Sequence, residues 1–229
     1  MNEIKFNFDL NLDDFDLNIN INDKFNSRYV KPKYCPEISE SKLKYKNAQK
    51  LADEITLSEA MRYYVVVDGT FIFGDLLEAI IVKNNLKCKK ITISTLSLSE
   101  NNIDSLHNLI EGGFIEELNI IISDYFYSHE RENLIRYMYQ ELDIDDKFQL
   151  AVASSHMKVT TLETFKGNKL VFHGSANMRS SSNLEQLMIE ENKDLYDFNN
   201  EIFTSIIDKY ATVKKSLRRN QLWNVIDNK

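Results

Sequence analysis

One stretch of the chain, residues 151–191, contains two pairs of polar side chains whose types could act on a phosphate. His156 and Lys158 are two positions apart, and Ser175 and Asn177 are two positions apart further along. Together they offer a nucleophile or base, a fixed cation, a hydroxyl and a carboxamide. This combination suits phosphoryl chemistry better than a metal site or acyl transfer.

The local structure expected here would bring the two pairs together. Side chains of a strand alternate between its faces, so an extended segment over residues 149–163 would present the imidazole and the ammonium on one face. A second extended run, residues 169–173, leads directly into Gly174-Ser175-Ala176-Asn177. A hairpin turn through residues 166–168 would return this sequence beside the first pair.

The stretch resembles one copy of the phospholipase D superfamily motif, written HxK(x)4D(x)6GSxxN and often reduced to HxK with GSxN. His156-Met157-Lys158 matches HxK, and Gly174-Ser175-Ala176-Asn177 matches GSxN. Glu185 stands where members often carry a downstream Glu. Two features depart from the motif: Glu163 replaces the Asp at the right spacing, and the gap before the glycine is longer, as an extended hairpin at residues 165–169 would produce.

This resemblance implies a metal-independent phosphodiesterase that works through a phosphohistidine. His156 would attack phosphorus, while Lys158 and Asn177 would hold the non-bridging oxygens. Ser175 would donate a further hydrogen bond. Glu185 would orient the imidazole by accepting its other N–H, as the third member of a catalytic triad does.

Three further residues have supporting roles in this interpretation. Glu163, in the place of the family's Asp, would order the local hydrogen-bond network. Arg179 and Ser180 follow Asn177 closely and would line a substrate groove.

The chain contains one copy of the motif, and this number affects the expected oligomeric state and substrate. A phosphohistidine route needs an acid for the leaving oxygen and a base for water, which superfamily members supply with a second histidine. The resemblance therefore implies a homodimer with a shared site across a two-fold axis. Small single-copy members are mostly nucleases, so the expected partner is nucleic acid, DNA in preference to RNA, with no metal and no cofactor. His173 is interpreted as structural, and His107 and His129 as residues of helix surfaces.

Two alternatives from other classes stay open. One is a nucleic-acid-binding or assembly protein that keeps the fold without strong catalysis, which Glu163 and the net charge of −7 favour. The other is a hydrolase of phospholipids or other phosphodiesters. The missing basic amphipathic helix argues against a lipid surface.

The composition limits the classes of protein to which this chain can belong. A chain of 229 residues that is 43% apolar suits one domain with an extension and a proper core. The two cysteines, Cys35 and Cys88, indicate neither a disulfide framework nor a zinc site. No signal peptide and no membrane-spanning run are recognisable, so we expect a soluble, cytoplasmic protein.

The hydrophobic pattern predicts the elements that position the motif. From Arg62 onward strands alternate with helices, which predicts an α/β class with a mixed, mostly parallel sheet flanked by helices. The resemblance implies that these strands and helices form a phospholipase D-like fold. Predicted helices cover residues 42–55, 57–61, 74–84, 103–110, 129–142 and 196–210, and predicted strands cover residues 63–73 (with a hairpin at Asp68-Gly69), 90–98, 118–123, 148–154 and 183–189.

Three regions follow from this pattern. Residues 1–61 form an N-terminal extension, whose first 22 residues alternate apolar and polar side chains and predict β strands. Residues 62–210 form the phospholipase D-like domain. Residues 211–229 form a C-terminal basic helix.

Overall fold

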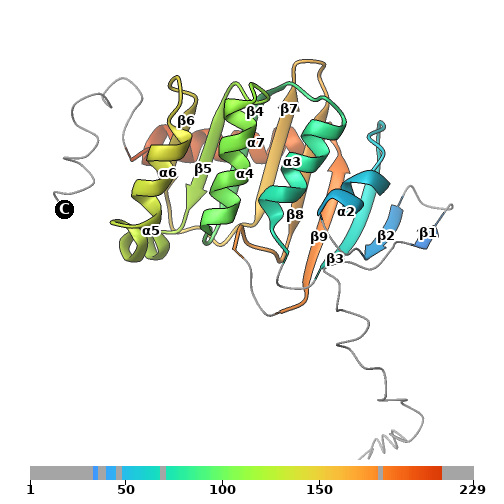
Figure 1. The fold of residues 1–229 in the computed structure, drawn as a ribbon, viewed down its shortest axis with the longest axis horizontal. Helices are drawn as coiled ribbons and strands as arrows, with labels where there is room; N and C mark the ends of the chain where they lie inside the picture. The colour runs from blue at the N-terminus through green and yellow to red at the C-terminus, as the bar shows by residue number, and fades with distance from the viewer. Residues whose placement is uncertain (1–32, 36–39, 45–47, 68–70, 180–182, 213–229) are drawn as a thin grey trace, which may run out of the picture.

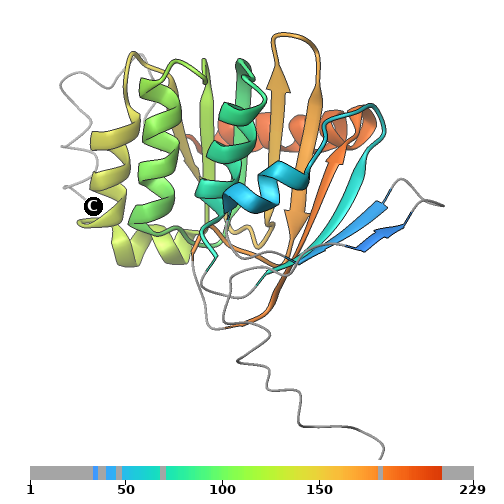
Figure 2. The same ribbon diagram turned by 45° about the vertical axis from the view of Figure 1, so that its right-hand side comes forward.

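The computed structural model describes residues 33–35, 40–44, 48–67, 71–179 and 183–212. The alternating residues 1–22 and most of the predicted C-terminal helix therefore lie outside the described residues. Within them, a single sheet separates a layer of helices from one long helix (Figures 1 and 2).

Among the described residues, the sheet contains nine strands in the order β1-β2-β3-β9-β8-β7-β4-β5-β6. Their bounds are β1 (Lys33–Cys35), β2 (Glu40–Lys44), β3 (Arg62–Val67), β4 (Cys88–Thr95), β5 (Leu118–Ile122), β6 (Phe148–Val152), β7 (Val159–Thr164), β8 (Lys169–Gly174) and β9 (Glu185–Glu191).

The predicted α/β class and mixed sheet are confirmed, but the balance of strand directions differs from the prediction. Three of the described neighbour pairs, β2–β3, β4–β5 and β5–β6, are parallel, and the other five are antiparallel. The predicted alternation with helices holds from β3 to β6. From β7 to β9 none of the described residues forms a helix, and consecutive neighbouring strands joined by short connections run antiparallel.

Helices cover both faces of the sheet. On one face lie α2 (Ala48–Glu54), α3 (Phe73–Lys83), α4 (Glu100–Glu111), α5 (Asp124–Glu130) and α6 (Leu134–Leu142), and on the other lies α7 (Lys193–Tyr210) (Figure 1). The side chains of Leu76, Ile80 and Leu106 are fully buried between the helix layer and the sheet. None of the described helices combines the length and the apolar character needed to cross a bilayer.

Four local predictions are wrong. Residues 40–44 form β2 rather than the start of a helix, because they pair with β3, and α2 begins only at Ala48. Residues 57–61 form a turn with Ala60 at a φ of 60°. The predicted strand does not extend to Phe73, which is buried and already begins α3, and the predicted hairpin at Asp68-Gly69 lies outside the described residues. The predicted helix 129–142 is two helices, the first capped by Ser123, whose hydroxyl accepts from the backbone N–H of Phe126.

A second, smaller core lies beneath α7. Phe203 packs with Ile121 of β5 and Ala151 of β6, and all three are fully buried. Met157 and Val159 pack against the same cluster from the connection before β7 and from β7 itself. This core connects α7 to the segment that carries the HxK sequence.

Candidate functional site

His156 and Lys158 lie in the connection between β6 and β7, not in a strand. The predicted extended segment is interrupted because β6 ends at Val152 and β7 begins at Val159. The loop nevertheless brings the two side chains together: Lys158 Nζ lies 3.1 Å from His156 Nδ1. This distance allows the ammonium to donate to Nδ1 when the ring is neutral, so the HxK pair is already assembled.

The HxK connection is fixed from two sides. The Ser155 hydroxyl accepts from the backbone N–H of Met157 at 3.2 Å and lies 3.4 Å from the Ser94 hydroxyl of β4. Ser154 donates to the Asp124 carboxylate at 3.0 Å. Sequence reasoning missed these hydroxyl residues, since single serines carry no signal of a contact between distant segments.

Gly174 is the last residue of β8, and its surroundings leave no room for a side chain. A Cβ atom there would lie 2.0 Å from the backbone oxygen of Gln186, which only a glycine avoids. The close approach lets Ser175 N–H donate to that same oxygen at 2.9 Å. The Ser175 hydroxyl donates to Glu185 and accepts from the N–H of Gln186 at 2.9 Å. Glu185 therefore orients the hydroxyl of Ser175, whereas the imidazole of His156 contacts Lys158.

Asn177 is held against the end of β4. Its Oδ1 accepts from the backbone N–H of Leu96 at 3.3 Å, which leaves its amide nitrogen to donate to a substrate oxygen. The next residue, Met178, donates its N–H to the hydroxyl of Thr95 at 3.1 Å and accepts from the N–H of Ser99 at 3.0 Å. Thr95 is a second positioning residue that the sequence did not reveal.

The two halves of the motif meet at one end of the sheet, the end opposite the β7–β8 turn in Figure 1. Gly174 N–H donates to the backbone oxygen of Lys158 at 3.3 Å, and Val159 pairs with His173. The predicted hairpin through residues 166–168 is confirmed and produces this return. His156, Lys158, Ser175, Asn177 and Glu185 thus share one end of the sheet.

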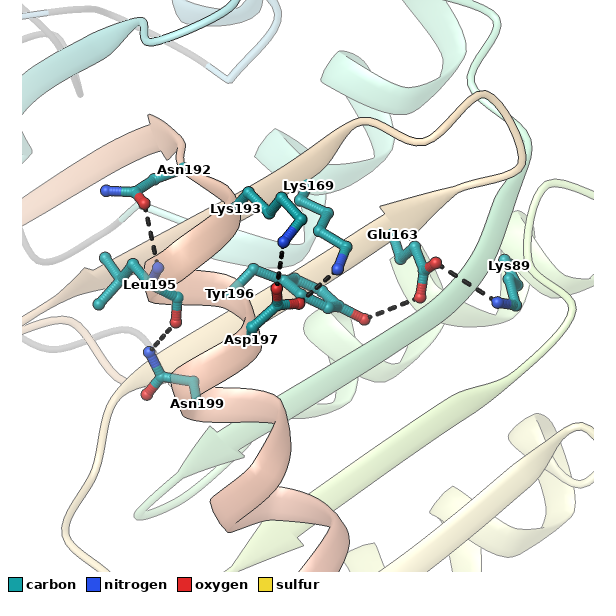
Figure 3. Close-up of polar contacts among 9 residues, drawn as sticks. All are labelled: Lys89, Glu163, Lys169, Asn192, Lys193, Leu195, Tyr196, Asp197 and Asn199. Atoms are coloured by element: carbon teal, nitrogen blue, oxygen red, sulfur yellow. Dashed lines mark hydrogen bonds and ion pairs between the residues drawn. The ribbon is translucent and has the colours of Figure 1, made fainter.

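Glu163 lies at the other end of β7. Five residues of strand separate it from Lys158, a distance of roughly 16 Å. There its carboxylate accepts from the Tyr196 hydroxyl at 3.2 Å and lies 3.4 Å from Lys89 Nζ (Figure 3). The structure therefore does not bring Glu163 together with the other motif residues.

Arg179 is exposed and lines a groove of about 540 Å³ next to the GSAN segment. Ser99, Asn101 and Asn133 line the same groove. Ser180 lies outside the described residues.

His173 points to the α7 side of the sheet. Its Nε2 lies 2.8 Å from Glu190, whose side chain is only 5% exposed and also accepts from Arg62 at 2.8 Å. Burial alone would raise the pKa of Glu190, but hydrogen bonds from His173, Arg62 and Asn192 outweigh it and hold that pKa below its usual value. Within the described residues, no group of three or more His, Cys, Asp or Glu side chains could hold a metal ion.

Comparison with solved structures connects this geometry to a known fold. The structure is similar to Nuc from Salmonella typhimurium, a phospholipase D family member, with a TM-score of 0.51, 16% sequence identity, and coverage of 66% of this chain and 97% of that chain. The chain has a phospholipase D-like fold. The fold prediction is thereby confirmed.

Two further solved structures are similar to this phospholipase D-like chain. NucT from Helicobacter pylori has a TM-score of 0.49 and 14% identity, over 67% of this chain and 99% of that chain. A phosphatidylserine synthase from Haemophilus influenzae has a TM-score of 0.49 and 12% identity, over 75% of this chain and 45% of that chain. No protein-family model and no curated protein sequence matches the chain.

Proposed function

We propose that this chain is a metal-independent phosphodiesterase, specifically a nuclease that forms a phosphohistidine intermediate in a homodimer. The observation that carries the proposal is the meeting of His156, Lys158, Ser175 and Asn177 at one end of the sheet of a phospholipase D-like fold.

The reaction has two displacements at phosphorus. A ring nitrogen of His156 attacks, a P–N bond forms, and the bond to the leaving oxygen breaks while that oxygen takes a proton. A water molecule then loses a proton to a base and attacks phosphorus, which breaks the P–N bond and restores the imidazole. Lys158 and the amide nitrogen of Asn177 stabilise the negative charge on the non-bridging oxygens in both steps.

The acid and base of these steps come from a second histidine. His173 lies at the same end of the sheet, but it is bound to Glu190 on the α7 face and so does not serve His156. The partner copy's equivalent of His156 is the histidine that a two-fold dimer brings to the same site. The exposed Arg179 contacts the substrate backbone beside the GSAN segment, with DNA preferred to RNA.

The deciding experiment is cleavage of labelled single- and double-stranded DNA and RNA in excess EDTA by the intact protein and by His156→Ala. We expect cleavage that survives EDTA and is lost in the variant. No cleavage of any of these substrates by well-folded dimer contradicts the nuclease.

Mixed dimers test the shared site. If both copies contribute a histidine to one site, a purified dimer of one intact and one His156→Ala chain should be inactive. Half of the intact activity in such a dimer would contradict the shared site while leaving the phosphodiesterase itself intact.

A binding or assembly protein is the second candidate, and the net charge of −7 and Glu163 favour it. Salt-sensitive DNA binding by the intact protein without turnover would support this candidate.

A further inference from the structure

The outer side of α7 carries an apolar stripe. Phe198, Ile202, Ile206 and Tyr210 follow one another at intervals of four residues, so they lie along one side of the helix. Phe198 is 61% exposed and Tyr210 is 45% exposed, with the described part of the chain in place. The stripe lines a groove of about 450 Å³, which also contains Glu201. An exposed apolar surface of this kind indicates a docking site.

The packing of α7 on the sheet accounts for only part of this stripe, since Ile206 also packs against the core beneath α7, whereas Phe198 and Tyr210 are exposed. The helix buries Tyr196, Asn199 and Phe203, which form its inner side. A helix that lies on a sheet and meets water elsewhere needs one apolar stripe only. The apolar surface of Phe198, Ile202 and Tyr210 is therefore available for a second contact.

We propose that the C-terminal segment of the same chain, residues 213–229, docks in this groove. The segment follows directly after Thr212, which is two residues beyond Tyr210. The N–H of Thr212 donates to the backbone oxygen of Leu150 at 3.0 Å. The segment thus begins beside one end of the groove. The stripe from Phe198 to Tyr210 is about 18 Å long at the rise of a helix, which the segment can span.

The composition of the segment fits the groove. Leu222 and Ile226 repeat the four-residue spacing of the stripe, and Trp223 lies beside them. Residues 213–229 contain five basic and one acidic residue, whereas α7 contains four acidic and two basic residues. Opposite charges therefore favour this segment over a second copy of α7, whose acids would oppose those of the first. The short tether also gives the segment a high effective concentration at the groove.

The single tryptophan of the chain, Trp223, provides the test. In the intact protein we expect acrylamide to quench its fluorescence several-fold less than in a synthetic peptide of residues 213–229. Ile202→Glu places a charge inside the groove and should raise quenching to the level of the peptide. Thr204→Glu places the same charge on an exposed position of α7 that does not line the groove, and should leave quenching unchanged.

A second variant guards against misfolding of Ile202→Glu. Glu201→Lys alters only an exposed groove residue and should raise quenching by a smaller factor. Quenching as strong in the intact protein as in the peptide would overturn the proposal, as would unchanged quenching in both groove variants with native circular dichroism. Protection that disappears on dilution would contradict docking within one chain and assign the contact to two copies. None of these readouts depends on enzymatic activity.

Discussion

The two ends of β7 carry residues of the same sequence motif and have different surroundings. At the beginning of the strand, His156 and Lys158 contact each other next to the exposed Ser175 and the half-buried Asn177. At the other end, Glu163 contacts Tyr196 and Lys89 (Figure 3). The length of the strand therefore divides the motif into an end where His156 and Lys158 meet, for which we propose the chemistry, and an end where Glu163 holds neighbouring side chains.

The helix α7 links the two ends. Near its beginning, Asp197 accepts from Lys169, and also from Lys193 at 3.0 Å, in the neighbourhood of Glu163. Hydrogen bonds from Lys169 and Lys193 hold the pKa of Asp197 below its usual value. In its second half, Phe203 belongs to the small core against which Met157, the residue between His156 and Lys158, packs. The Glu163 end thus anchors a helix that packs beneath the His156 end.

The largest expected effect separates the two ends directly. His156→Ala should lower phosphodiester turnover by roughly a thousandfold or more, because the attacking atom is removed. Glu163→Gln should change turnover by no more than about threefold, because a neutral amide still accepts from Tyr196. Single-turnover cleavage in EDTA measures both. Equal losses in the two variants would show that Glu163 acts in the chemistry, against the separation described above.

Removal of the support under the HxK connection should have the next largest effect. Phe203→Ala leaves a cavity beneath α7 and should lower the free energy of unfolding by about 3–5 kcal/mol. Turnover should also fall, since Met157 loses its packing partner. Urea unfolding gives the first quantity, with Thr204→Ala at an exposed position of the same helix as the control. A native-like stability of Phe203→Ala would mean that α7 does not hold the site.

A smaller effect is expected from the hydroxyl that fixes Glu163. Tyr196→Phe should cost about 1–2 kcal/mol of stability, because a carboxylate loses a hydrogen bond. Burial, and then the nearby charge of Glu163, raise the pKa of Tyr196. A raised pKa in the folded state means that this contribution is present below about pH 10 and declines above it. Unfolding at several alkaline pH values should show a shallower decline for Tyr196→Phe, whereas Tyr125→Phe, at an exposed tyrosine, should behave as the intact protein.

The smallest effect concerns the acid that binds His173. The pKa of Glu190 is lowered in the folded state, so its contribution is present above about pH 4.5 and is lost as the pH falls through the folded value. Glu190→Gln should therefore flatten the fall in stability on acidification, and Glu132→Gln, at an exposed position, should not. Thermal unfolding between neutral and acidic pH measures the slopes. Parallel curves for the intact protein and Glu190→Gln would rule out this carboxylate as a source of acid sensitivity.

The positions of several helices and strands could be predicted from the period of the hydrophobic pattern. Helix α3 and the strands β4 and β5 lie close to their predicted positions, because long apolar patterns there match one period throughout. The sequence of residues 40–44 suits a helix, but these residues form a strand because they pair with β3. Their structure therefore depends on a partner strand that the local sequence does not reveal. Strand direction was likewise not encoded locally, since it depends on whether a helix separates consecutive strands.

The sequence by itself determined the chemical types and the pairing of the motif residues, because HxK and GSAN each keep their partners two positions apart and a hairpin of fixed spacing returns one beside the other. Only the tertiary structure decided which of them meet. The rise of a strand carries Glu163 to the far end of β7, and the close approach of Gly174 to Gln186 turns Ser175 toward Glu185. Contacts of this kind join residues that are distant in the chain, so no local pattern specifies them.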